Sequence, residues 1–577
     1  MTGAGAAGRE PAATGPLAGL DPQQLEAATA VRGPVCVLAG AGTGKTRVVT
    51  RRIAHAVETG AFTPQRVMAV TFTTKAAGEM RGRLRALGVD GVAARTFHAA
   101  ALAQLNYFWP QVAGDTAPAV LSGKVRLLGQ VADEARVRVD GATLRDLAAR
   151  IERRKVTMLS IEEDAARHPR GLGALDADAV ADLQRAYERH KDGRRQLDFE
   201  DVLLACAGMI EAEPRVAQAV REQYRHFTVD EFQDISPLQF RLLELWLGAR
   251  RDLCVVGDPS QTIYSFAGAD PAYLLEFTHR YPDAQVVRLE RNYRSDAAVL
   301  AVANTLMRGR PGALELRGDA PPGPKPRLRG YPDERAEAEG VAALVAAQLA
   351  AGARPAEVAV LYRANAQSAL LLSALAARGI AAKVLGGARF FDLPEVRQAV
   401  LALRGAAVAP TTAPLAQAVR DILRSLGLTD EPPAADGALR EGWEARATLL
   451  RLAEQAPEDM TMRAFADDLQ ARARDQHEPT METVTLATLH AAKGLEWPHV
   501  HLVGLAEGLL PIGYATTFEQ VDEERRLAYV GITRAARTLS LSWADGARGP
   551  SRFLQEIGTD TLDAGGARTS GGARSSR

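Results

Sequence analysis

The feature that most constrains the fold is an apolar run that breaks into glycines, a lysine and a threonine, "VCVLAGAGTGKTRVV" at 35–49. It fits the phosphate-loop pattern, in which a strand leads to a turn of inward-pointing N–H groups and then to a helix N-terminus. Alanine stands at the first glycine position. An ordinary strand, turn and helix with an exposed lysine is the alternative. The residues of the predicted loop and first helical turn are Ala39, Gly40, Ala41, Gly42, Thr43, Gly44, Lys45 and Thr46.

A second stretch supplies the acidic groups that such a loop requires. In "FTVDEFQD" (227–234), Asp230 and Glu231 follow directly on an apolar strand. One carboxylate there can hold a metal ion, with the Thr46 hydroxyl as a further ligand, and the next can polarise a water molecule. An exposed acidic loop is the alternative. Together the two stretches predict a site that binds Mg²⁺ and a nucleotide, with Lys45 reaching its phosphates.

Composition limits the remaining possibilities. A chain of 577 residues is too long for one core, and 47% hydrophobic with 24% charged residues is typical of folded globular domains. Because Lys+Arg and Asp+Glu are 70 each, any nucleic acid must bind in a local groove. The three cysteines are far apart, and we find no long apolar segment or signal peptide. We therefore expect a cytoplasmic protein without membrane contact.

Short apolar runs alternate with helical patterns along the chain, which predicts parallel sheets covered by helices. Two stretches, from Ala99 to about Leu204 and from about Gly405 to Thr480, are mainly helical in pattern and interrupt this alternation. The apolar runs lie at 35–39, 66–73, 226–232, 252–258, 286–290, 357–365 and 499–505.

A series of motifs resembles, in order, a superfamily 1 helicase of the UvrD/Rep/PcrA type. The match covers nearly the whole chain outside its two ends, and a series of this length is highly specific. Its segments are "LDPQQLEAAT" (20–29), "AGAGTGKTRV" (39–48), "AVTFTTKAAGEMRGRL" (69–84), "TFHA" (96–99), "VDEFQD" (229–234), "VVGDPSQTIYSFAGAD" (255–270), "LERNYRS" (289–295), "TLATLHAAKGLEW" (485–497) and "EERRLAYVGITRA" (523–535).

The resemblance implies an α/β fold with two RecA-like P-loop domains, each carrying a mainly helical insertion. It also implies ATP-driven movement on single-stranded DNA, 3′ to 5′, with unwinding of forked duplex DNA in repair or replication restart, together with an unidentified repair-protein partner. The expected parts are 17–95 with 205–286 (first domain), 96–204 (its insertion), 287–404 with 478–558 (second domain), 405–477 (a reduced insertion), and disordered tails at 1–16 and 559–577.

The resemblance also assigns roles around the nucleotide. Gln24 would read adenine, because an amide can pair with both N6 and N7, and Arg47 and Tyr293 would stack on the base. Gln261 would sense the γ-phosphate and Glu496 would contact the sugar. The two arginines expected to reach the γ-phosphate from the second domain are Arg294 and Arg534.

Eight residues fall in segments that line the single-strand path of similar helicases. Their hydroxyls would hold phosphates and their rings would stack on bases without reading sequence, whereas core packing is the alternative for the phenylalanines. The basic run "ARIERRKVTML" (149–159) is either a solvated face or a contact to duplex phosphates. The eight residues are Thr71, Phe72, Thr73, Phe97, His98, Tyr264, Phe266 and His490.

Two departures from the family keep other functions open. Ala267 stands where the family usually has arginine after an aromatic residue, and the second insertion is short. A DNA-stimulated ATPase that barely unwinds is therefore an alternative. A nucleotide-gated DNA-binding subunit is a more distant one, because Lys45, Asp230, Glu231 and Arg534 are intact. RNA binding stays open, since backbone and stacking contacts do not read the 2′-hydroxyl decisively.

Overall fold

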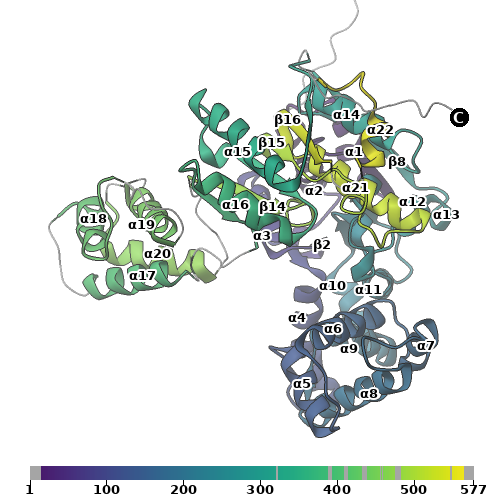
Figure 1. The fold of residues 1–577 in the computed structure, drawn as a ribbon. Helices are drawn as coiled ribbons and strands as arrows, with labels where there is room; N and C mark the ends of the chain where they lie inside the picture. Colours follow the sequence, from purple (N-terminus) through teal and green to yellow (C-terminus); the bar gives the residue numbers. More distant parts are fainter. Residues whose placement is uncertain are drawn as a thin grey trace, which may run out of the picture. The chain divides into compact units, whose positions relative to one another are not determined.

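The computed structural model of the chain (Figure 1) forms two compact units. The first contains the described residues up to Asn292 together with Gly309–Leu316, and the second contains Tyr293–Arg308 and the described residues from Arg317 onward. The structure describes residues 15–319, 322–386, 391, 393–407, 413–431, 438–454, 456–457, 459–474, 482–545 and 549–564.

The first unit is built on a six-stranded parallel sheet in the order β3-β2-β6-β7-β1-β8. Four of its strands, β1, β2, β6 and β7, are buried along their whole length, as expected when helices cover both faces of a parallel sheet. The strands are β1 (Val35–Ala39), β2 (Val67–Thr71), β3 (Ala93–Thr96), β6 (His226–Val229), β7 (Leu253–Gly257) and β8 (Gln285–Leu289). The helices that accompany them are α1 (Pro22–Thr29), α2 (Lys45–Glu58), α3 (Thr74–Ala86), α10 (Pro214–Gln223) and α11 (Pro237–Leu247).

Between β3 and β6 the chain forms the expected helical insertion, with its own core around Leu128, Ile151 and Tyr187. A short parallel pair, β4 (Ala119–Val120) and β5 (Gln196–Leu197), joins the segment after its first helix to the segment before its last helix. The last helix runs past the predicted limit at residue 204. The helices are α4 (Phe97–Ala113), α5 (Lys124–Glu134), α6 (Gly141–Val156), α7 (Ile161–Arg167), α8 (Ala177–Gly193) and α9 (Phe199–Ala212).

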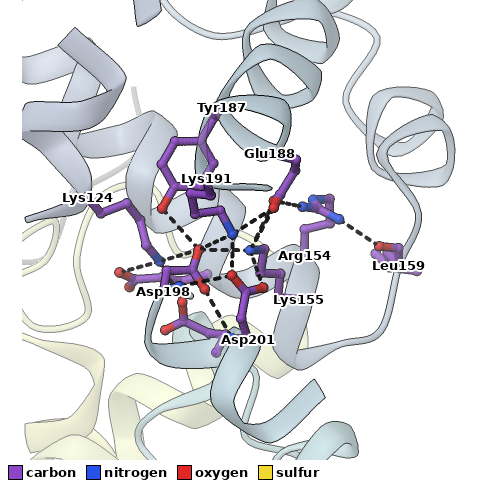
Figure 2. Close-up of polar contacts among 11 residues, drawn as sticks. Lys124, Arg154, Lys155, Leu159, Tyr187, Glu188, Lys191, Asp198 and Asp201 are labelled. Carbon is purple, nitrogen blue, oxygen red and sulfur yellow. Dashed lines mark hydrogen bonds and ion pairs between the residues drawn. The ribbon is translucent and has the colours of Figure 1, made fainter. Parts of the chain in front are cut away.

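A buried ion network joins α5, α6, α8 and the start of α9 (Figure 2). Lys155 Nζ lies 2.8 Å from Asp198 Oδ2 and 2.6 Å from Asp201 Oδ1. Lys191 contacts the same two carboxylates, and the Tyr187 hydroxyl donates to Asp198 at 3.0 Å. Burial raises the pKa of Asp198, but the surrounding lysines outweigh burial and lower it well below its usual value. The charges in this network therefore neutralise one another, and their ion pairs hold the helices together.

This network corrects the prediction for the basic run at 149–159. Arg150, Arg154 and Lys155 are each no more than 9% exposed, and carboxylates of the insertion itself neutralise them. Arg153 is exposed. The expectation of a basic face is therefore wrong for the three buried residues, which form internal ion pairs instead of a solvated or phosphate-contacting surface.

The second unit contains another six-stranded parallel sheet, in the order β11-β16-β15-β12-β14-β13. Its strands are β11 (Arg327–Tyr331), β12 (Val358–Tyr362), β13 (Ala382–Val384), β14 (Val484–Thr488), β15 (Trp497–Leu502) and β16 (Ala535–Ala544). Its helices include α14 (Ala297–Met307), α15 (Glu334–Ala350), α16 (Ser368–Ala376), α21 (Phe518–Ile532) and α22 (Arg552–Ile557).

The second insertion has a separate core that includes Val396, Leu423 and Phe465. Because α17 contributes to this core, the insertion begins near Pro394 and not at the predicted residue 405. Its helices are α17 (Pro394–Ala406), α18 (Leu415–Ser425), α19 (Ala438–Glu454) and α20 (Met462–Arg474).

Other predicted boundaries also need correction. β8 extends to Leu289 in the first sheet, so the first unit continues past the predicted limit at residue 286. Gly15–Leu17 forms a short 3₁₀ turn, and Leu562 is 4% exposed, so both predicted tails include folded residues at their inner edges. Residues 1–14 and 565–577 lie outside the described residues. Within the part of the chain that the structure describes, no helix is long and apolar enough to cross a membrane.

Candidate functional site

The predicted phosphate loop lies between β1 and α2 in the first unit. Gly42 and Gly44 have φ values of 69° and 84°, in the left-handed region that glycine adopts without strain. No side chain caps the N-terminus of α2, which begins at Lys45. The first N–H groups of this helix are therefore suited to bind an anion.

Side chains hold several carbonyl groups of this loop. Lys45 Nζ donates to Ala39 O at 3.1 Å and Gln24 Nε2 donates to Thr43 O at 2.9 Å. Asn292 Nδ2 donates to Ala41 O at 2.7 Å and is 2% exposed. These bonds fix the orientation of the peptide groups, which leaves N–H groups as the donors for a phosphate.

Asn292 was not predicted as a site residue, although it lies in the quoted "LERNYRS" segment. Gln24 is buried at the third position of α1, where its amide also accepts from the backbone of the helix cap Asp21. Arg47 Nη2 donates to Gly19 O at 2.6 Å. Both predicted base-binding residues of the first unit therefore lie beside the loop, and adenine reading stays a prediction.

The two predicted acids follow β6, whose neighbours in the sheet are β2 and β7. Asp230 N donates to Val70 O at 2.9 Å, and Glu231 has a φ of 56°, a left-handed conformation that costs energy for a residue with a side chain. Burial, together with the adjacent Glu231 charge, raises the pKa of Asp230 to about 7, although Lys45 acts in the opposite direction. The positive charge of Lys45 therefore does not fully compensate this carboxyl group, as expected for a group that binds a cation.

Gln261 lies in the same cluster. Its Nε2 donates to Asp258 Oδ2 at 2.6 Å, and Gln233 Oε1 accepts from Asp258 N at 3.0 Å. Gln233 Nε2 in turn donates to Glu231 Oε2 at 2.5 Å. A Cβ atom at Gly257 would lie 2.6 Å from Gln233 Oε1, so this close connection requires glycine. Gln233 therefore links Glu231 to the end of β7.

Asp258 and Gln233 were missed as site residues. Both lie in quoted motifs, Asp258 directly after β7 and Gln233 shortly after β6, which is the signal that could have identified them. Among the described residues, no three His, Cys, Asp or Glu side chains are close enough to hold a metal ion by themselves. Thr46 and Asp230 fit Mg²⁺ nevertheless, because this ion usually takes one or two protein ligands and completes its shell with substrate phosphates and water.

The aromatic residues predicted to contact DNA divide into buried and exposed groups. Phe97 is 1% exposed and stacks on Trp246, with ring centroids 5.8 Å apart. The half-buried Phe72 meets the Phe97 ring edge-on at 6.3 Å. The stacking role predicted for Phe97 is therefore wrong, and core packing is correct. Phe266 is 59% exposed, next to the partly buried Tyr264.

A further exposed ring lies at the start of α9. Phe199 is 56% exposed and stacks on His98, with ring centroids 3.7 Å apart and planes 11° apart. Burial lowers the pKa of His98 to about 4, so its imidazole is neutral at pH 7. Phe199 was not predicted from the sequence. An exposed aromatic residue in "LDFED", directly after a helix-capping aspartate, was the available signal.

The predicted threonines have different positions. Thr71 is buried at the end of β2, and Thr73 is exposed and caps α3 by accepting from Ala76 N at 3.1 Å. His490 follows β14 in the second unit. Burial, with Arg363 and Lys493 nearby, lowers the pKa of His490 to about 4.

In the second unit, three predicted residues gather around Thr533. Arg294 Nη1 donates to Thr533 O at 3.4 Å and also pairs with Glu496. Arg534 is 2% exposed and donates from Nη2 to Thr533 Oγ1 at 3.2 Å. Arg534 also donates to the carbonyls of Val530 and Leu495, each at 3.0 Å. Arg534 thus has structural contacts within its own unit.

The remaining predicted residue of this unit is Tyr293, which is 47% exposed at the start of the unit. Glu496, predicted to contact the nucleotide sugar, is the partner of Arg294 in this structure. The sugar contact therefore stays a prediction.

Comparison with known proteins finds two adjoining family matches. The UvrD/REP helicase N-terminal domain matches residues 20–282, and the UvrD-like helicase C-terminal domain matches residues 287–425 and 447–546. The ATP-dependent DNA helicase UvrD2 of Mycobacterium tuberculosis (strain ATCC 25618 / H37Rv) is 48% identical over 580 residues, which cover 94% of this chain and 82% of the relative.

More distant relatives match over a similar extent. The ATP-dependent DNA helicase Rep of Escherichia coli (strain K12) is 29% identical, with 94% of each chain covered. The ATP-dependent DNA helicase PcrA of Bacillus subtilis (strain 168) is 28% identical, with 95% of this chain and 87% of the relative covered. The similarity therefore extends over both units.

Proposed function

Because this chain belongs to the UvrD/REP family of ATP-dependent DNA helicases, it is an enzyme that uses ATP to separate DNA strands, and we propose that it moves 3′ to 5′ on single-stranded DNA. The observation that supports movement driven by ATP is the cluster at the carboxyl edge of the first sheet, whereas the polarity rests on the similarity to the family. There Lys45, Asp230, Glu231 and Gln261 follow three different strands. Ligands of parallel α/β sheets bind at this edge.

The nucleotide phosphates would lie on the N–H groups of the loop and the N-terminus of α2. Lys45 would leave Ala39 O, which it contacts at 3.1 Å, and turn its ammonium group to the β/γ-phosphates. Gln24 would bind the adenine edge and Arg47 one face of the base. The bonds from Asn292 and Thr43 keep the loop in shape during this change.

Thr46 and Asp230 would hold Mg²⁺, which neutralises charge on the phosphates when bound. Glu231 would accept a proton from the attacking water, and its bond to Gln233 fixes the direction of the carboxylate. Gln261, bonded to Asp258, would respond to loss of the γ-phosphate. Gln261 shortly precedes the turn that contains the exposed Phe266. Hydrolysis would therefore depend on a group that is close in sequence to a proposed DNA contact.

We propose that Arg294 and Arg534 of the second unit supply further positive charge to the γ-phosphate. A planar guanidinium is suited to charge that spreads over equatorial oxygens, and such residues are worth about 10³ to 10⁵ in turnover. The shared contacts to Thr533 support a common role, because a shift of the segment that contains Thr533 would affect both arginines.

On the DNA side, the exposed rings of Phe266 and Phe199 would stack on bases, and Thr73 would contact a phosphate. Neither type of contact reads sequence. We propose single-stranded and forked DNA as substrates, repair or replication restart as the setting, and the cytoplasm as the location. A repair protein is the expected partner.

A second candidate function is a DNA-stimulated translocase with little autonomous unwinding. Ala267 is exposed beside Phe266, at the position where the family usually has arginine. Without that charge, the turn that follows Gln261 has one positive group fewer with which to contact a DNA phosphate. Coupling between hydrolysis and strand movement would then be weaker.

Duplexes with a single-stranded tail on either the 3′ or the 5′ side test both candidates. We expect the wild type to unwind the 3′-tailed duplex, and Glu231→Gln to lose both hydrolysis and unwinding by about 10²-fold to 10⁴-fold, the usual contribution of a general base. The exposed Glu276→Gln is the matched control.

Preference for the 5′-tailed duplex would contradict the proposed polarity. Strong ATP hydrolysis on DNA without strand separation on either duplex would favour the translocase. If Glu231→Gln kept wild-type hydrolysis, the assignment of the water-activating residue would be wrong.

A further inference from the structure

The opposite edge of the first sheet contains a group of arginines that the nucleotide site does not use. Four neighbouring strands, β2, β6, β7 and β1, start at this amino edge, and one or two arginines precede each of them. Together they line a pocket of about 570 Å³, with Asp252 as the carboxylate in its wall. The arginines are Arg32, Arg66, Arg225, Arg250 and Arg251.

Two of the five have carboxylate partners. Arg32 Nη1 lies 3.0 Å from Asp252 Oδ2, and Arg251 pairs with Asp283, which is outside the pocket lining. Asp252 also accepts from Gly33 N at 2.8 Å. The acidic groups at this edge are therefore already engaged.

The other three have no carboxylate within ion-pair distance among the residues that the structure describes. Arg66 donates to Glu222 O, and Arg250 donates to Tyr224 O at 3.2 Å. Arg225 is exposed. Burial lowers the pKa of Arg250, and the neighbouring arginines, including Arg225 and Arg66, lower it further. The Glu222 carboxylate acts in the opposite direction but does not outweigh them, so the repulsion among these positive charges is only partly relieved.

Capping of backbone carbonyls explains only part of this arrangement. Arg66 and Arg250 each use one terminal nitrogen for carbonyls at the end of α10, and a guanidinium has five N–H donors. Arg225 caps nothing among the described residues. The remaining N–H groups are available to an anion that enters the pocket, and the planar guanidinium binds phosphate through paired hydrogen bonds.

The lining favours phosphate groups over nucleobases and carboxylates. The His226 ring stacks on Phe62, with centroids 3.9 Å apart, so one of its faces is covered. Burial lowers the pKa of His226 below its ordinary value of 6.5, which leaves it neutral at pH 7. Several uncompensated arginines around a small pocket require closely spaced negative charges. Consecutive phosphates supply these, whereas carboxylates on a peptide are farther apart.

We propose that this pocket is a second phosphate-binding site, which takes a run of linked phosphates and is separate from the nucleotide site. β1 spans five residues between the two edges, which places them about 16 Å apart. The phosphates come either from a soluble polyphosphate or from the backbone of DNA. The chemistry of recognition is the same in both cases, and it does not depend on hydrolysis at the opposite edge.

Isothermal titration calorimetry with inorganic tripolyphosphate tests this site. The P-loop is unchanged in all the pocket variants, so a difference in binding between these variants and the wild type reports the pocket. We expect tripolyphosphate to bind the full chain at the pocket as well as at the P-loop, with affinity that falls as salt rises. The double variant Arg225→Glu with Arg66→Gln should weaken binding by at least about tenfold. The loss of two charge-assisted contacts should lower the binding free energy by more than about 1.4 kcal/mol, which corresponds to a factor of ten.

The matched control is Arg215→Glu, which makes the same charge reversal at an exposed arginine on α10. Arg225→Ser is the second variant, because Arg225 has no side-chain partner among the described residues and its loss should not disturb the fold. We expect Arg215→Glu to bind like the wild type and Arg225→Ser to bind more weakly. An equal loss in Arg215→Glu and the pocket variants would overturn the proposal, and so would absence of binding to the wild type.

Two competitors identify the source of the phosphates. If a 20-base-pair blunt duplex displaces tripolyphosphate from the wild type, the pocket takes DNA backbone; if it does not, the pocket takes a soluble polyphosphate. Both results support a phosphate site. Displacement by poly-glutamate at equal charge concentration would show a general acidic-ligand surface and would overturn the assignment to phosphate.

Discussion

Lysines and buried carboxylates meet in two regions of the first unit, and the charges are balanced in opposite ways. At the carboxyl edge of the sheet, burial and the adjacent Glu231 raise the pKa of Asp230 to about 7. In the helical insertion, lysines such as Lys155 outweigh burial and lower the pKa of Asp198 below its usual value (Figure 2). In the first region Lys45 alone does not outweigh burial, whereas in the second region lysines from several helices do.

This difference in charge balance distinguishes a ligand-binding site from an ion network that stabilises the fold. A buried carboxyl group without enough compensation is costly in the unliganded protein, and a cation or substrate can relieve that cost. A compensated network gains nothing from a ligand, but the loss of one member leaves charges unpaired in a poorly solvated place. Substitutions in the two regions should therefore affect different measurements.

The largest expected effect is on turnover. Lys45→Ala should lower the rate of ATP hydrolysis by about 10³-fold, because it removes a preorganised charge from the phosphate site. The melting temperature of the unliganded protein should change little, since Lys45 is half-buried and contacts only a backbone carbonyl among the hydrogen bonds of the described residues. Steady-state kinetics measures the hydrolysis rate, and thermal unfolding measures the melting temperature. Retained turnover would show that the loop does not hold the reacting phosphates.

The complementary change is Lys155→Met in the ion network. It should destabilise the insertion by about 3–5 kcal/mol, because Asp198 and Asp201 lose a buried partner. Hydrogen exchange in α6 and α8 measures the local stability. Hydrolysis per folded molecule should stay near wild type. The control is Arg153→Met on the same helix, whose exposed side chain should contribute less than about 0.5 kcal/mol. Equal effects in both variants would contradict a stabilising network.

A pair of phenylalanines extends the comparison to uncharged residues. Phe266→Ala should weaken binding of single-stranded DNA by about 1–3 kcal/mol without loss of stability, because its ring is exposed. Phe97→Ala should instead lower the melting temperature, because its ring stacks on Trp246 in the core. Fluorescence anisotropy with an oligonucleotide, together with thermal unfolding, separates these results. If Phe97→Ala changed DNA affinity alone, the burial argument would fail.

The smallest expected effect is the pH dependence of the stability that the ion network contributes. Because the folded-state pKa of Asp198 is depressed, its contribution to stability is complete above the unfolded value of 3.8 and is lost as the pH falls through the folded value. Lys191 has a raised pKa, so its contribution is complete below 10.5 and is lost at higher pH. The contributions of Asp198 and Lys191 should therefore be insensitive to pH between about 4 and 10.

Thermal unfolding of the wild type and Asp198→Asn across this range measures the contribution. The difference in melting temperature should be constant from pH 7 to about pH 4 and should shrink below it. A difference that already shrinks near pH 6 would contradict the depressed pKa. The groups that surround Asp198 and share this titration are Lys124, Lys155, Tyr187, Glu188, Lys191, Glu200 and Asp201.

The sequence predicted the parts of the site that depend on local order. A strand, a glycine turn and a helix N-terminus follow one another along the chain, so the loop at 39–46 could be recognised without tertiary contacts. The acids after β6 were equally local. The two parallel sheets followed from alternating apolar runs.

Residues whose role depends on distant partners could not be predicted. Lys155 looked like part of a basic face, but its carboxylate partners lie 33 to 46 residues later. Phe97 looked available for stacking, but Trp246 covers it from α11. The arginines before four strands formed no visible motif, because only the strand order brings them together.

The central claim is that this chain couples ATP hydrolysis to single-stranded DNA. Steady-state hydrolysis by the purified full chain, with and without single-stranded DNA at low and moderate salt, tests it most directly. We expect DNA to stimulate hydrolysis strongly, and the stimulation to weaken as salt rises because phosphate contacts are screened. Hydrolysis that is absent, or unchanged by DNA, in demonstrably folded protein would contradict the claim.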